Sequence, residues 1–169
     1  APYGGAERLS QWRALVELQT AGKARSIGVS NFNRGHLDEI RTAGLPTPDA
    51  NQIELHPLID QTRMIAHLAS KGIPVEAYSP LAQGKVMKNA MLREIAAVHY
   101  ASPAQIALAW VLTRPMSIAL PRTGNKNRLA DNLGAADIML SAEEIASIDA
   151  LGLAEGRLVS PETLAPAWD

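Results

Sequence analysis

The sequence contains no cysteine, which excludes both a disulfide framework and a thiolate nucleophile. It also lacks an apolar run of the roughly 18 residues that a membrane-spanning helix requires. The first residues, APYGGAERLSQW, have neither the basic start nor the apolar middle of a signal peptide. We therefore expect a cytoplasmic protein without a membrane partner.

An excess of charge of one sign is also missing. The formal net charge is -1, and the charged residues are spread along the whole chain. Binding to a nucleic acid or an anionic membrane depends on a strongly basic surface, so neither partner is expected. The length of 169 residues is typical of one domain, residues 1–169, because two independent domains would be cramped.

Several motifs of nucleotide and metal chemistry are absent. There is no G-x-G-x-x-G, P-loop lysine or G-x-S-x-G elbow, which argues against a Rossmann dehydrogenase, an NTPase and a serine hydrolase. The histidines lie far apart and form no HExxH-like pair; they are His36, His56, His67 and His99. No metal site is predicted.

Four short segments rich in β-branched or apolar residues are present, and each precedes a helical pattern. They are residues 25–30, 51–55, 74–79 and 117–121. Another helical pattern, residues 7–20, comes before the first segment. Strands separated by helices run parallel, so the pattern predicts an α/β protein of the form α-(βα)4. Whether it forms a small open sheet or half of an eight-stranded barrel stays open at this point.

Local signals predict where the helices begin and end. The predicted N-caps are Asn33, Asp60, Ser102 before Pro103, and Ser141 in a capping box with Glu144. Gly44 and Gly72 are predicted stops. Residues 81–88 are predicted to form a longer loop. The large apolar residues predicted to lie in the core are Trp12, Met64, Trp110 and Met139.

Polar residues lie at the C-terminal ends of the predicted strands, where active sites of parallel barrels are found. They are Ser30-Asn31, Tyr78-Ser79 and Arg122-Thr123, with Gln52 inside another strand. Taken alone, Ser30 and Asn31 are also typical of a turn or a helix cap, and Tyr78 of a packing aromatic. The cations Arg122, Lys126 and Arg128 could be a solvated helix start, but helix N-termini also attract phosphate.

Four strings, in this order and at these spacings, resemble the second half of an aldo-keto reductase: GKARSIGVSNF, NQIELHP, AYSPLAQG and LPRTGNKNRLADN. The resemblance covers nearly the whole chain, up to the terminal APAWD. It implies a (β/α)8 TIM barrel, of which this chain holds roughly the second half, α-(βα)4 plus a C-terminal helix and tail. It also implies reduction of aldehydes and ketones with a nicotinamide cofactor.

The resemblance assigns residues to the nicotinamide. Ser30, Asn31 and Gln52 match the residues that hydrogen-bond its carboxamide, a task that suits amide and hydroxyl groups because a carboxamide offers both a donor and an acceptor. Tyr78 matches the aromatic residue on which the nicotinamide ring stacks.

The resemblance also assigns residues to the phosphates. The loop that passes over the pyrophosphate contains Ser79, Leu81 and Gln83, and relatives often carry Ser in place of Gln83. Arg122, Thr123 and Arg128 match the cluster that binds the adenosine 2′-phosphate, with Asn132 near the adenine. Many relatives carry Lys at position 122, where arginine keeps the charge and adds a fork that fits phosphate. NADP(H) is therefore expected rather than NAD(H).

The catalytic Tyr, Lys, Asp and His of this family come from the first half of its barrel. Tyr3 and Tyr100 lack the family context of the catalytic acid, so no catalytic residue is predicted here. His56 matches a family string and is predicted to be structural. A half barrel exposes strand edges and an inner sheet face, on the order of several hundred Å² of apolar surface. We therefore expect a truncated product, or a chain that pairs with a complementary N-terminal half or with itself.

Three functions are considered. The leading one is an NADP(H)-dependent reductase of a small carbonyl substrate, with Trp168 expected to border the substrate pocket. The second is a non-catalytic nucleotide-binding fragment or regulatory subunit, and the third is a fragment that binds nothing. The last is least compatible with residues that match every carboxamide and phosphate position.

Overall fold

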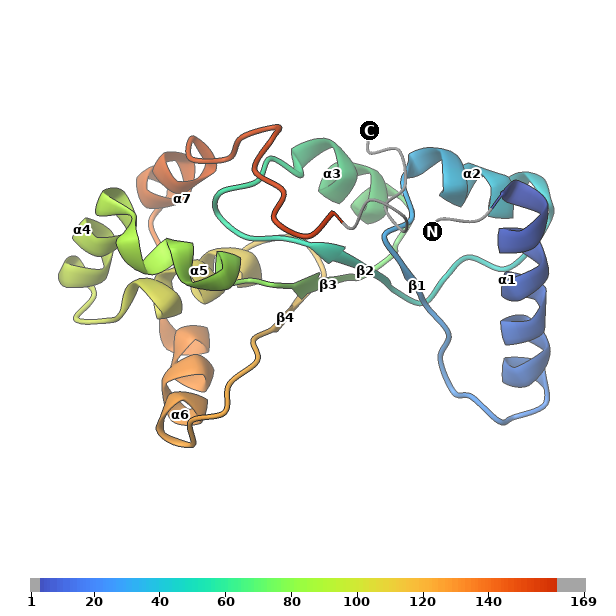
Figure 1. Ribbon diagram of the computed structural model, residues 1–169, viewed down its shortest axis with the longest axis horizontal. Helices are drawn as coiled ribbons and strands as arrows, with labels where there is room; N and C mark the ends of the chain where they lie inside the picture. The colour runs from blue at the N-terminus through green and yellow to red at the C-terminus, as the bar shows by residue number, and fades with distance from the viewer. Residues whose placement is uncertain (1–3, 161–169) are drawn as a thin grey trace.

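A four-stranded parallel sheet organises the computed structural model, which describes residues 4–160 (Figure 1). The strands are β1 (Val29–Ser30), β2 (Asn51–Glu54), β3 (Val75–Tyr78) and β4 (Ser117–Leu120), paired in sequence order. The helices are α1 (Gly5–Thr20), α2 (Arg34–Thr42), α3 (Thr62–Ser70), α4 (Ala90–Val98), α5 (Pro103–Leu112), α6 (Asn127–Gly134) and α7 (Ala142–Asp149), with 3-10 helices η1 (Ala82–Lys88) and η2 (Ala135–Asp137). The predicted α/β order of a helix followed by four βα units is confirmed.

The helices begin and end at the local signals read from the sequence. Three predicted caps are present: Asn33 on α2, Ser102 on α5 and Ser141 on α7. Gly44 and Gly72 follow α2 and α3 with φ values of 65° and 67°, a conformation that favours glycine. The cap of α3 lies at Gln61, one residue later than predicted, while Asp60 Oδ1 accepts a hydrogen bond from the Thr62 N–H at 2.9 Å.

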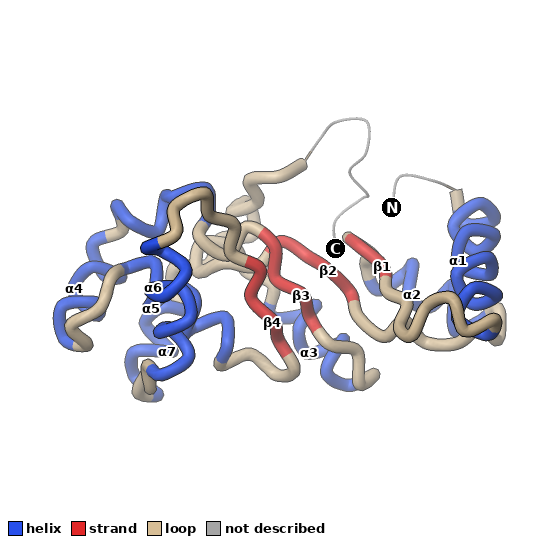
Figure 2. Tube along the Cα trace, turned by 90° about the horizontal axis from the view of Figure 1, so that it is seen from below, coloured by secondary structure: helices blue, strands red, loops and turns tan. Residues whose placement is uncertain are grey.

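The strand register gives the sheet two different faces. One face carries the aligned rows Val29, Asn51, Val75, Ser117 and Ile53, Ala77, Ala119, and packs into the core beneath the helices. The other carries the rows Ser30, Gln52, Glu76, Ile118 and Glu54, Tyr78, Leu120. The described helices leave this second face open (Figure 2). We call it the open face; its Ile118 and Leu120 are 51% and 39% exposed.

Helix α5 forms the centre of the larger core. Six consecutive residues, from Ile106 to Val111, are buried, because the helix is surrounded by β4, α4 and η2. Within residues 4–160 no single helix is long and apolar enough to cross a membrane. The pair α4 and α5 meets the length and composition criteria only jointly, with a bend of 88° between them.

Met139 is an error of the sequence interpretation. Trp12, Met64 and Trp110 are buried as predicted, but Met139 is 84% exposed. Its neighbours Ile138 and Leu140 both pack against the core, and the extended chain between η2 and α7 turns Met139 the opposite way. Apolar character alone therefore did not distinguish the inward from the outward positions of this segment.

Two further segments differ from prediction. The first strand was predicted over residues 25–30, but only Val29–Ser30 joins the ladder. It lies at the sheet edge, and the N–H of Ile27 bonds the Asp49 carboxylate at 2.8 Å instead of a strand carbonyl. Residues 81–88, predicted as a loop, contain the 3-10 helix η1, which is kinked where Gln83 and Gly84 adopt φ values of 52° and 87°.

Candidate functional site

The C-terminal ends of the parallel strands bring the predicted nicotinamide residues to one edge of the sheet. Asn31 and Ser79 follow β1 and β3 directly and have φ values of 55° and 51°, so the chain turns away immediately after each strand. The N–H of Asn31 donates to the Gln52 carbonyl at 2.9 Å, and the Ser30 hydroxyl donates to the same carbonyl at 3.2 Å. These bonds hold Ser30 and Asn31 against β2.

Side-chain hydrogen bonds connect the same residues. The Gln52 amide donates from Nε2 to Glu76 Oε2 at 2.8 Å, and the Tyr78 hydroxyl donates to Asn31 Oδ1 at 3.1 Å. Burial, together with the nearby Glu54 carboxylate, raises the pKa of Tyr78 above its usual value, so the phenol is neutral at physiological pH. The structure thus brings together all four residues predicted to contact the nicotinamide.

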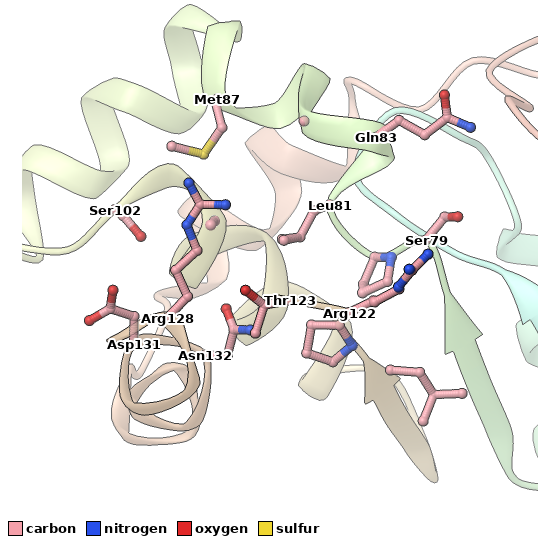
Figure 3. A pocket seen from close by; sticks show the side chains of 15 residues that line it. Ser79, Leu81, Gln83, Met87, Ser102, Arg122, Thr123, Arg128, Asp131 and Asn132 are labelled. Carbon is pink, nitrogen blue, oxygen red and sulfur yellow. The ribbon is translucent and has the colours of Figure 1, made fainter. Parts of the chain in front are cut away.

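A pocket of about 690 Å³ lies on the β4 side of this edge (Figure 3). It is lined by seven predicted cofactor residues: Ser79, Leu81, Gln83, Arg122, Thr123, Arg128 and Asn132. In Figure 3 the Arg128 side chain extends from α6 toward η1, and Arg122 extends from the end of β4. Within residues 4–160, Arg122 and Arg128 form no ion pair. The pocket therefore presents two guanidinium groups for which the described part of the chain supplies no carboxylate partner.

The backbone beside this pocket is ordered by its own side chains. Thr123 Oγ1 accepts a hydrogen bond from the Asn125 N–H at 3.1 Å, and Asn125 Oδ1 accepts one from the Asn127 N–H at 3.0 Å. These turns lead directly into α6, whose first turn carries Arg128. The positive end of the α6 dipole thus lies beside Arg128, an arrangement that suits an anion.

The sequence interpretation missed the residues that hold the C-terminal segment against the strand ends. Glu54 is fully buried, and its carboxylate accepts hydrogen bonds from the N–H groups of Leu158 at 2.8 Å and Val159 at 3.1 Å. The Arg157 guanidinium lies 3.6 Å from Glu54 Oε2. We call residues 153–159 the tail segment.

The charge of Glu54 is stabilised within the protein. Burial alone would raise its pKa, but the hydrogen bonds from His56, Leu158 and Val159 outweigh burial and lower it below the usual value. His56 Nδ1 accepts a bond from the Leu58 N–H, so the ring proton is assigned to Nε2, which donates to Glu54 at 3.1 Å. His56 has this fully buried, structural position, which agrees with its predicted role.

Other predicted features lie elsewhere. Tyr100 is completely exposed at the end of α4, away from the strand ends. Within residues 4–160 no three His, Cys, Asp or Glu side chains are grouped so that they could hold a metal ion. Trp168 lies outside the described residues. A signal for Glu54 and Glu76 existed in the sequence, because both share the period-two alternation of Gln52 and Tyr78.

Known proteins match this chain over most of its length. Methylglyoxal reductase DkgB of Escherichia coli O157:H7 is 39% identical over 158 residues, covering 93% of this chain and 58% of that protein. Glyoxal reductase of Bacillus subtilis is 38% identical over 153 residues, covering 90% and 55%. The crystal structure of a Gox0644 mutant in complex with NADPH superposes with a TM-score of 0.84 at 36% identity, covering 88% and 55%.

The chain spans little more than half the length of these relatives. Its parallel sheet corresponds to part of the (β/α)8 barrel that the related structures form, which confirms the predicted partial barrel. The sequence model of the Aldo/keto reductase family matches residues 2–152. The chain therefore belongs to the aldo/keto reductase family of oxidoreductases.

Proposed function

We propose that this chain provides the NADP(H)-binding part of a reductase that converts aldehydes or ketones to alcohols. The observation that carries the proposal is the continuous set of strand-end amides and pocket arginines along one edge of the sheet. The related NADPH complex supports the choice of cofactor. When bound, NADPH would supply the hydride that reduces the carbonyl carbon.

The donors and acceptors present fit the parts of this cofactor. Arg122 and Arg128 would hold the 2′-phosphate, since guanidinium groups pair with phosphate oxygens through parallel N–H donors. Thr123 adds a hydroxyl, and Asn132 would lie by the adenine. At the other end Ser30, Asn31 and Gln52 would bind the carboxamide, and the ring of Tyr78 would support the nicotinamide.

Replacement of Arg128 by alanine tests the phosphate assignment. We expect Arg128→Ala to weaken NADPH binding about 10–100-fold, the range for losing a hydrogen bond to a charged group, and to change NADH binding little. Fluorescence titration of both nucleotides measures the two affinities. Lys126→Ala is the matched control, because Lys126 is a nearby cation outside the pocket lining and should change neither affinity. Equal losses for NADPH and NADH in Arg128→Ala would contradict the assignment.

The substrate we propose is a small carbonyl compound, which the reductases of glyoxal and methylglyoxal among the relatives support. No catalytic residue is assigned to this chain, and Trp168 stays a proposed substrate contact. A nucleotide-binding subunit without catalysis is the alternative. NADPH binding without NADPH oxidation on a panel of aldehydes would select the alternative, whereas oxidation by the chain alone would exclude it.

We also propose that a complementary N-terminal half covers the open face. The chain covers only 58% and 55% of two of its relatives, and Ile118 and Leu120 expose apolar surface on that face. Size-exclusion chromatography of the 169-residue chain tests this. A dilute monomer with cooperative unfolding would contradict the proposal, and a stable dimer would identify a second copy as the occupant instead.

A further inference from the structure

Two opposite charges from distant parts of the sequence meet beside the proposed nicotinamide end. Glu54 is the last residue of β2, Arg157 belongs to the tail segment, and Arg157 Nη1 lies 3.6 Å from Glu54 Oε2. The Glu54 side chain is fully buried and the Arg157 side chain is 14% exposed. Because water screens buried charges only weakly, this pair acts on its neighbours more strongly than surface charges would.

Glu54 lies directly beside Tyr78, the residue proposed to support the nicotinamide ring. The two are partners in the parallel register of β2 and β3, so both side chains belong to the same row of the open face. Arg157 and Asn31 line the same small cavity at the strand ends. Burial raises the pKa of Tyr78 most; the charge of Glu54 raises it further, and the charge of Arg157 opposes this rise. Both charges therefore act where the ring would lie.

Arg157 is held in this place by a buried anchor. The Glu54 carboxylate accepts hydrogen bonds from the N–H groups of the two residues that directly follow Arg157, at 2.8 and 3.1 Å. On the other side, Gly156 lies so close to the β2–α3 loop that a Cβ atom there would be 1.8 Å from the Leu58 carbonyl oxygen. The tail segment is thus fixed on both sides of Arg157.

The two redox forms of the proposed cofactor differ in charge at this end. The nicotinamide ring is a cation in NADP⁺ and neutral in NADPH, whereas the phosphate groups are the same in both. A carboxylate beside the ring attracts the oxidised form, and a guanidinium repels it. The ratio of the dissociation constants for NADP⁺ and NADPH isolates this effect, because contacts made by the phosphates cancel.

We propose that the Glu54–Arg157 pair sets the relative affinity of the chain for NADP⁺ and NADPH. Glu54 favours the oxidised form. Arg157 opposes Glu54 and thereby favours release of the oxidised cofactor that a reductase produces. The inference rests on the proposed function but goes beyond it, because it gives the tail segment a role at a site to which it supplies no predicted cofactor residue.

Replacing one charge at a time should move this ratio in opposite directions. Glu54→Gln leaves the positive charge of Arg157 uncompensated, so we expect the Kd for NADP⁺ relative to that for NADPH to rise about tenfold. Arg157→Met leaves Glu54 uncompensated, and the same ratio should fall about tenfold. Glu54 stays ionised in this variant, because its hydrogen bonds from His56 and from the tail N–H groups do not involve the arginine side chain.

Variants that change the charges together, or keep them, separate electrostatics from structure. The double variant Glu54→Gln/Arg157→Met removes both charges and should return the ratio to within about threefold of wild type. Arg157→Lys keeps the positive charge and should leave the ratio unchanged. Glu76, in the neighbouring row of the open face, is charged in every variant and contributes equally to all. A merely structural role of the tail segment would change both dissociation constants by one factor.

Isothermal titration of the 169-residue chain with each nucleotide measures the ratio. Glu94→Gln and Arg93→Met, the same substitutions at exposed positions of α4, are the controls and should not change it. If Arg157→Met is poorly folded, Arg157→Gln takes its place, because it keeps an N–H donor without the charge.

Two results would decide against the inference in different ways. A ratio that stays constant, or that moves in one direction, in folded Glu54→Gln and Arg157→Met would overturn it and leave the proposed function intact. If the wild-type chain bound neither nucleotide, the proposed function would fail, and the inference with it.

Discussion

The two ends of the candidate cofactor site differ in how their polar side chains are satisfied. At the β1–β3 end, Asn31, Gln52 and Tyr78 are each hydrogen-bonded to another side chain of the protein. At the pocket end, Arg122 and Arg128 form no ion pair with any residue in the described part of the chain. One end is organised before any ligand binds, and the other presents unpaired charge.

This difference indicates a division of tasks. Amide side chains that are already hydrogen-bonded within the protein have a fixed orientation. They therefore lose little conformational entropy when a ligand binds, and they discriminate between its donor and acceptor groups. Unpaired guanidinium groups attract an anion from a distance but depend on that anion to fix their rotamers. In the proposed function, the first end would determine how the nicotinamide is oriented and the second would determine the preference for a phosphorylated nucleotide.

The largest predicted effect on stability comes from a substitution that prevents the tail segment from packing against the β2–α3 loop. Gly156→Ala places a Cβ atom 1.8 Å from the Leu58 oxygen and 2.8 Å from the Ile59 Cα, so the backbone must move or the tail segment must detach. We expect the free energy of unfolding to fall by about 2–3 kcal/mol, as for overpacked sites. Gly124→Ala is the control, since nothing lies within 4 Å of its Cβ position. Denaturant titration measures both, and equal stability of the two variants would contradict the close approach.

Most of the fold could be predicted because its signals are local. The caps Asn33, Ser102 and Ser141 each bond an N–H three residues ahead, so a short sequence window contains the whole interaction. Met139 shows where such windows fail, because its direction depends on which neighbours reach the core. The periodicity of apolar residues also could not distinguish an open sheet from half of a barrel. The four sequence strings that resemble the family, found in the family's order, indicated the half barrel.

The site was predicted in part for the same reason. Strand-end residues such as Asn31 and Tyr78 follow from position along each strand, and the structure brings them together, although their ligand roles stay predictions. The bonds from Leu158 and Val159 to Glu54 join residues more than 100 positions apart, and no local pattern contains them. Arg157 therefore carried no signal that could have linked it to Glu54.

Glu54→Gln tests the anchor of the organised end. An amide cannot accept bonds from both tail N–H groups without turning its own NH₂ toward one of them, so we expect a loss of about 2 kcal/mol at pH 7. The exposed Glu94→Gln should cost less than about 0.5 kcal/mol under the same conditions. Thermal or denaturant unfolding measures both changes.

The pH dependence of the same variant follows from linkage. The pKa of folded Glu54 lies below its usual value of 4.5, so the stability it contributes is complete above that value and is lost as the pH falls through the lower folded pKa. The gap between wild type and Glu54→Gln should therefore be constant from pH 7 to about pH 5 and shrink in stronger acid. A gap that grew as the pH fell would contradict an ionised Glu54.

Salt is expected to have a smaller effect on nucleotide affinity, and this effect should distinguish the pocket end of the site from the β1–β3 end. Raising NaCl from about 50 mM to about 500 mM screens exposed charges, and Arg122 and Arg128 are exposed. We expect NADPH binding to weaken about tenfold and NADH binding about threefold, because only NADPH carries the 2′-phosphate. Isothermal titration at the two salt concentrations measures this, and parallel losses would mean that the pocket arginines do not meet that phosphate.

The smallest predicted effect belongs to the Tyr78 hydroxyl. Tyr78→Phe keeps the ring on which the nicotinamide would stack and removes only the hydroxyl that donates a hydrogen bond to Asn31. We expect the dissociation constants of NADPH and NADH to rise by the same factor, about threefold, because the lost orientation concerns the nicotinamide that both share. Tyr78→Ala, which also removes the ring, should give a larger but equally unselective loss. If Tyr78→Phe weakened NADPH alone, the hydroxyl would act on the phosphate end, and the two ends could not be treated as separate parts of the site.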